Sequence, residues 1–178
     1  MNKGPIVLVL ALLFSCTLVA QQPSARHKNH QLQVLISHTQ IHSALDLEGN
    51  RKWQSLPSWG LNYNFQVADK WKIGLHQDIV VEDFQVATLG RNEAEVLDRR
   101  YPLASALVVS RTLADHFQLL MGIGGEFAPG QHFLLFRGGI EYGYYLDDNW
   151  ELIGNVTNDF KWEAYNSWAI GMGVSRLF

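Results

Sequence analysis

Six ionisable side chains lie at small or polar positions in stretches that otherwise alternate with large apolar residues. They are Glu126, Arg137, Asp159, Glu141, His76 and Asp78. A charge held away from water is costly unless an opposite charge and hydrogen bonds satisfy it. The planar guanidinium of Arg137 can serve two carboxylates at once, so we expect it to bridge Glu126 and Asp159.

Counting residues from shared turns places these three side chains at one level of an enclosed interior. The same count places Glu141, His76 and Asp78 one layer lower. Two interpretations follow for this interior polar cluster. It plugs and rigidifies the protein, or it relays protons or ions through the lower three residues.

Histidines suggest metal chemistry as a further candidate. The candidate ligands are His27, His30, His38, His42 and His132. Two residues four apart on one face of a strand lie about 13 Å apart, at about 3.3 Å per residue, which is too far to share one ion. We therefore predict rim histidines, and neither a metal site nor another cofactor.

Alternation with a period of two predicts the elements that must position these groups. Eight stretches show it, at residues 31–39, 58–67, 71–82, 101–110, 117–126, 134–144, 150–160 and 168–178. One face carries aliphatic and aromatic residues, and the other carries Gly, Asn, Glu and Arg. In the last stretch Trp168, Ile170, Met172, Val174 and Phe178 share the apolar face, broken by Arg176.

A soluble barrel such as a lipocalin has the opposite arrangement, with an apolar interior. The pattern therefore predicts an all-β fold, an eight-stranded antiparallel up-and-down transmembrane β-barrel with lipid outside.

Connections between the stretches sort into two kinds. Three short polar turns are each followed by an aromatic residue, Trp71, Phe117 or Trp150, which we predict to form a girdle at the periplasmic interface. Residues 43–57 and 83–100 are long polar connections and residues 128–131 and 161–166 are shorter ones, all predicted to face the exterior.

The N-terminal residues predict export. Lys3 precedes an apolar run at residues 6–14, and small residues lead to Ala20, so residues 1–20 are expected to be a signal peptide cleaved after Ala20. The alternative is a lipoprotein box at residues 13–16 that would lipidate Cys16. Residues 21–30 would form a lead-in, and residues 31–178 the barrel.

Composition narrows the possibilities further. Cys16 is the single cysteine, so cleavage after Ala20 leaves no disulfide to stabilise the mature chain. Loss of Lys3 takes the formal charge from −3 to −4, which argues against nucleic acid as a partner. No second apolar stretch is long enough for a spanning helix, so strands must make any crossing.

Four segments carry a resemblance to a known group of proteins. Residues 56–63, 71–76, 138–143 and 170–178 are similar to small outer-membrane barrels of Bacteroidota that are generally described as uncharacterised or porin-like. The resemblance implies the fold and an outer-membrane location in a Gram-negative cell after signal peptide removal. It also implies insertion by the barrel assembly machinery through a terminal strand ending in Phe178. It supplies no catalytic residue.

The expected function is a structural or surface-interaction role. Eight strands enclose a space that side chains can fill, so we expect a plugged monomer, surrounded by outer-membrane lipid, whose long loops meet an extracellular partner that the sequence does not name. The alternatives are a narrow channel for a small solute or ion, and a lipid A-modifying enzyme.

Catalysis is the least supported of these roles. Outer-membrane lipid A deacylases carry a lipid-facing His-x-Ser motif, and this chain has none. The nearest string, Ser37–His38, has the wrong order, and no histidine is predicted beside the lipid-facing Ser105. We therefore expect no enzyme and no catalytic residue.

Overall fold

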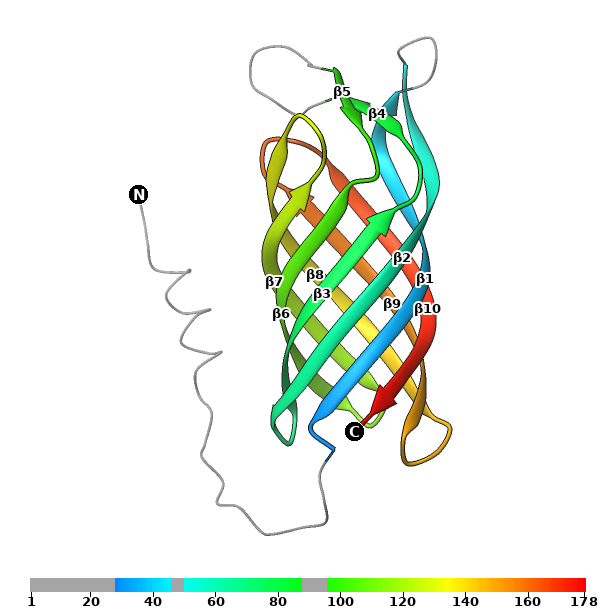
Figure 1. Cartoon of the computed structure of the whole chain (residues 1–178), viewed down its shortest axis with the longest axis vertical. Helices are drawn as coiled ribbons and strands as arrows, with labels where there is room; N and C mark the ends of the chain where they lie inside the picture. The colour runs from blue at the N-terminus through cyan, green and yellow to red at the C-terminus, as the bar shows by residue number, and fades with distance from the viewer. Residues whose placement is uncertain (1–27, 46–49, 88–95) are drawn as a thin grey trace, which may run out of the picture.

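A computed structural model describes residues 28–45, 50–87 and 96–178, which form one antiparallel sheet of ten strands closed into a barrel (Figure 1). Eight long strands make the wall: β1 (His30–Leu45), β2 (Arg51–Ala68), β3 (Trp71–Val80), β6 (Leu103–Ala114), β7 (Phe117–Phe127), β8 (His132–Tyr145), β9 (Trp150–Lys161) and β10 (Asn166–Leu177). The predicted eight-stranded barrel is confirmed. In the described part of the chain, no helix is long and apolar enough to span a membrane.

The barrel closes because β1 pairs with both β2 and β10. Following paired residues around the wall from Gln40 through Trp168, Met121 and Phe65 leads back to β1 at His30, a shift of ten residues (40 − 30). Such a stagger requires strands tilted by roughly 35–45° from the barrel axis. The tilt decides which interior side chains reach the same height.

Large apolar side chains cover the outside of the wall. Leu107 on β6 is 58% exposed and Met172 on β10 is 73% exposed, whereas the intervening side chains point inward. This outward-apolar arrangement is the one that lipid requires and water disfavours.

Aromatic residues mark two levels of the outer wall. Trp71, Phe117 and Trp150 are the first residues of β3, β7 and β9, all at the end where the C-terminus lies (Figure 1). A second level, absent from the sequence prediction, lies near the opposite end and includes Trp59, Phe136, Phe160 and Trp168.

The spacing of the two levels can be judged on β9. Trp150 and Phe160 are ten residues apart on that strand. At about 3.3 Å per residue and a tilt near 40° they are separated by about 25 Å along the axis. This separation equals the usual height of the apolar band in a transmembrane barrel.

The predicted long connections are wrong in extent. Most of residues 43–57 continues β1 and β2, because Ala44 pairs with Lys52 and Leu45 pairs with Arg51. Residues 83–100 contain a second hairpin, β4 (Phe84–Ala87) and β5 (Val96–Arg99), which attaches to β1 through Ala44 and Val86.

The described part of the N-terminal lead-in is short. Lys28 donates to Asn149 Oδ1 at 2.7 Å, so it lies against the β8–β9 turn. The predicted signal peptide, Cys16 and His27 lie outside the described residues.

Candidate functional site

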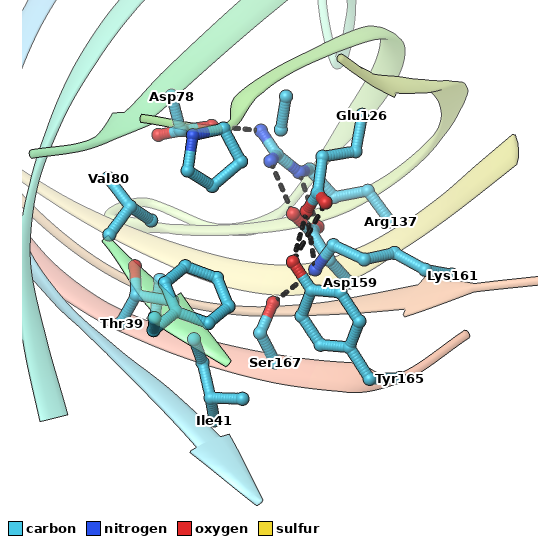
Figure 2. Close-up of a pocket in the computed structure, with 14 residues that line it drawn as sticks. Thr39, Ile41, Asp78, Val80, Glu126, Arg137, Asp159, Lys161, Tyr165 and Ser167 are labelled. Carbon is cyan, nitrogen blue, oxygen red and sulfur yellow. Dashed lines mark hydrogen bonds and ion pairs between the residues drawn. The ribbon is translucent and has the colours of Figure 1, made fainter. Parts of the chain in front are cut away.

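Glu126 is the centre of a buried polar cluster in the upper lumen. Its carboxylate accepts hydrogen bonds from Arg99 Nη2 at 2.5 Å and Nε at 3.1 Å, and from the Tyr165 hydroxyl at 2.8 Å. Lys161 Nζ lies 3.3 Å from its other oxygen. Figure 2 shows the side chains of Glu126, Lys161 and Tyr165 converging.

Arg137 forms the second part of the cluster. It donates two bonds of 2.7 Å to Asp159, from Nε and Nη2, and one of 2.5 Å from Nη1 to Asp78. The expected Arg137–Asp159 contact is present, but the expected Arg137–Glu126 bridge is wrong. Glu126 pairs with Phe133, four residues away from Arg137 along β8, and strand tilt brings Asp78 to the height of Arg137 instead.

The cluster is electrically balanced. Three cationic side chains meet three carboxylates, namely Arg99, Arg137 and Lys161 with Asp78, Glu126 and Asp159. Every carboxylate has at least one charged partner, which is the condition under which buried charges are tolerated. Burial, and then the Glu126 carboxylate, raise the pKa of the Tyr165 hydroxyl well above its usual value, so this group stays a neutral donor.

A layer of amides fills the lumen below this cluster. Gln33 donates to Glu141 at 2.8 Å and accepts from Asn62 at 3.0 Å, while His76 shares a 2.9 Å hydrogen bond with Asn64. The structure therefore gives His76, Asp78 and Glu141 separate partners and does not join them into the proposed relay. Asp78 also lies higher than predicted, at the level of Arg137, from which it accepts a hydrogen bond.

The β4–β5 hairpin covers the cluster from above. Phe84, Val86 and Leu97 are buried against apolar residues of the wall and against Tyr165. Arg99, only 1% exposed, extends from this hairpin to Glu126 and to the carbonyl oxygen of Gln131 at 2.8 Å. The upper lumen thus has an apolar layer above a charged one.

A cavity of about 30 Å³ remains between the two layers. Asp78, Arg137 and Lys161 line its charged side, and Phe84 and Pro102 line its apolar side. Since a single water needs at least about 10–15 Å³ of such space, the cavity accommodates only one or two waters.

Three members of the cluster were missed from the sequence. Lys161 has the same parity as Asp159, so it could have been found by extending that strand by one residue. Arg99 lies on the same buried face as Leu97, in a segment for which the sequence predicts a loop. Tyr165 lies in the β9–β10 connection, and no sequence pattern marks it as interior.

The described histidines lie mainly in aromatic surroundings. His30 stacks on Phe178, with ring centroids 5.6 Å apart, and shares a 2.6 Å hydrogen bond with Tyr63. His42 meets Trp53, and His132 meets Phe127. Among residues 28–45, 50–87 and 96–178, no group of three or more His, Cys, Asp or Glu side chains is arranged to hold a metal ion.

Comparison with known proteins gives a fold. No protein-family model matches the chain, and no curated protein sequence matches it. Solved structures do match. The outer membrane protein OprG from Pseudomonas aeruginosa is 15% identical with a TM-score of 0.57, covering 84% of this chain and 95% of that one.

Two further structures agree with this match. Neisserial surface protein A (NspA) is 10% identical with a TM-score of 0.51, covering 84% of this chain and 97% of that one. The N-terminal β-barrel domain of Pseudomonas aeruginosa OprF is also 10% identical, with a TM-score of 0.50 and coverages of 83% and 97%. At these identities the likeness shows the fold, which is that of eight-stranded outer-membrane barrels.

Proposed function

We propose that this protein is a monomeric outer-membrane barrel of a Gram-negative cell, with a closed lumen and a structural or surface-interaction role. One observation carries the proposal: side chains occupy the lumen at successive levels. The β4–β5 hairpin fills the mouth, the six charges lie beneath it, and hydrogen-bonded amides occupy the lower half.

This filling disfavours an open pore. A hydrated ion would have to separate Arg99 from Glu126 and Arg137 from Asp159, and each separation would leave a buried charge without its partner. The cavity of about 30 Å³ offers no continuous path through these layers.

Two features support placement in the outer membrane. Apolar side chains cover the wall between two aromatic levels, and the wall strands are joined by short turns at the end that carries Trp71, Phe117 and Trp150. Short turns face the periplasm in this kind of barrel, which leaves the β1–β2 and β4–β5 hairpins outside to meet a partner. Signal peptide removal, insertion by the barrel assembly machinery and the link to Bacteroidota remain predictions.

Enzymatic activity is not part of the proposal. Ser105, the serine predicted to face lipid, is paired in the neighbouring strands with Gln77 and Gly125 and not with a histidine. The relatives in fold are described as outer membrane and surface proteins.

Planar bilayer recording tests the closed lumen. The wild-type protein, first shown to be folded by a gel band that shifts on boiling, should give no steady single-channel current. Arg137→Ala should leave the membrane equally silent, since Arg99, Lys161 and the β4–β5 hairpin still fill the mouth. A defined wild-type conductance that changes with Arg137→Ala would establish the channel alternative instead.

A further inference from the structure

Polar side chains interrupt the apolar outer wall on the β1–β2 hairpin. On the outward face of β1 lie His38, Gln40 and His42, and on the outward face of β2 lie Ser55, Trp53 and Arg51. We call these six residues the β1–β2 outer column. Trp53 is 60% exposed at its centre, so the column presents an aromatic face as well as polar groups.

Side chains within the column contact one another across the two strands. Gln40 Nε2 donates to Ser55 Oγ at 2.6 Å, and Ser55 Oγ lies 3.5 Å from His38 Nδ1. His42 meets the Trp53 ring edge-on, with centroids 4.8 Å apart. The column is therefore an ordered surface in which amide, hydroxyl, imidazole and indole groups are adjacent.

The strand register gives the height of the column on the wall. Gln40 pairs with Trp168, a member of the upper aromatic level, so the column begins at the membrane surface and rises toward Arg51. At this level β8 and β9 carry Phe136 and Phe160 on their outer faces. Directly below the column the outer face is apolar again, with Ile36, Trp59 and Leu61 exposed.

This order of groups matches an amphipathic ligand. An exposed indole offers an apolar platform for the C–H face of a sugar ring, and amide and hydroxyl groups hydrogen-bond sugar hydroxyls. A guanidinium binds phosphate in a two-pronged geometry. The apolar residues below would lie along acyl chains.

We propose that the β1–β2 outer column binds the phosphorylated sugar headgroup of an outer-leaflet glycolipid. Trp53 carries the sugar, Gln40 and Ser55 bond its hydroxyls, and Arg51 with His42 meets its phosphate. The acyl chains descend over Ile36 and Leu61. This site rests on the proposed outer-membrane location and adds a ligand class to it.

Native mass spectrometry of the detergent-solubilised, folded protein tests the site. The probes are a bisphosphorylated lipid A, the same lipid with its phosphates removed, and phosphatidylcholine, each added at equal concentration. Wild-type protein should retain one molecule of bisphosphorylated lipid A at least tenfold more strongly than either other lipid. Glucosamine phosphate in solution should compete weakly, since it lacks the chains.

Variants separate binding at the column from general attraction between the lipid phosphates and any exposed basic side chain. The double variant Arg51→Gln, Trp53→Leu should lose at least tenfold of the preference. Arg111→Gln is the matched control, because Arg111 is likewise an exposed arginine of the outer wall, but it lies 5.3 Å from the Trp71 centroid at the opposite end of the barrel. It should bind as the wild type does.

Three outcomes would overturn the proposal: equal retention of all three lipids, undiminished binding by the double variant, or Ser55-dependent loss of an acyl chain, which would mean hydrolysis. The boiling shift is read on the same samples. If the shift is present but the lipid preference is absent, the glycolipid site fails and the barrel assignment stands.

Discussion

Glu126 shows how one carboxylate can organise the top of the lumen. Its partners come from three separate segments: Arg99 from β5, Lys161 from β9 and Tyr165 from the β9–β10 connection. Each partner alone would leave oxygen lone pairs unsatisfied, and the adjoining cavity of about 30 Å³ has room for only one or two waters. Together they fix the β4–β5 hairpin on the barrel mouth.

Removing Arg99 tests this arrangement. Arg99→Met should destabilise the folded protein by about 3–5 kcal/mol, because a buried carboxylate would lose its closest charge. Equilibrium urea unfolding in lipid vesicles, followed by tryptophan fluorescence, measures the change. Arg100→Met is the control, since the neighbouring Arg100 is exposed, and it should change the free energy of unfolding by less than about 0.5 kcal/mol. Equal effects of the two variants would show that the Arg99–Glu126 pair contributes nothing.

Some glycines are required because two neighbouring β-strands approach too closely for a side chain. A Cβ atom added at Gly124 on β7 would collide with the Ser105 carbonyl oxygen and lie 2.5 Å from Ala106 Cα on β6. A Cβ atom at Gly138 on β8 would meet nothing within 4 Å. These two glycines therefore have different roles despite similar sequence surroundings.

Alanine substitution distinguishes these two glycines. Gly124→Ala should cost about 1–3 kcal/mol through overpacking against a backbone that cannot move aside. Gly138→Ala should be close to neutral. The fraction of refolded protein that migrates as the compact, heat-sensitive band reports both effects, and a normal yield for Gly124→Ala would contradict the close β6–β7 contact.

The wall strands were predictable because lipid and lumen impose opposite demands on alternating residues. On β7, for example, Leu119, Met121 and Ile123 mark the outer face wherever the strand is placed. The β4–β5 hairpin was not predictable in this way. Its strands have four residues each, too few for a clear period.

The sequence could predict only some of the pairs that charged side chains form inside the lumen. Arg137 and Asp159 are direct cross-strand neighbours, so counting residues found them. Asp78 bonds Arg137 from a non-adjacent strand. The relative height of the two residues depends on the ten-residue stagger of the closed barrel, which the sequence of one strand does not reveal. Arg99 enters from a hairpin outside the wall.

The molecule as a whole has an apolar belt that must face lipid. Leu107 lies near the middle of β6, paired with Leu75 and Ile123, and Leu113 lies next to the short β6–β7 turn. The two side chains are equally exposed, at 58% and 59%. If both side chains faced water, a charge would cost the same at either position. In a bilayer, a charge would cost more at Leu107 than at Leu113.

Arginine at these two positions measures the belt. Leu107→Arg should cost about 2–4 kcal/mol in vesicles, and Leu113→Arg about 0–1 kcal/mol, because the cost of a charge falls toward the interface. The free energy of unfolding in the same lipid gives both values. Equal costs would place the belt outside a membrane.

The β1–β10 seam has a consequence for how the chain assembles. Gln31 pairs with Leu177, so the contact between the first and last strands joins residues from opposite ends of the described sequence. Folding rates fall as contacts become more distant in sequence. Until β10 pairs with β1, both strands present unpaired backbone N–H and C=O groups, which hydrocarbon cannot satisfy. The two free edges must therefore be shielded together and joined in a single late event, and the lifetime of that open intermediate sets the window in which the chain can aggregate or be degraded.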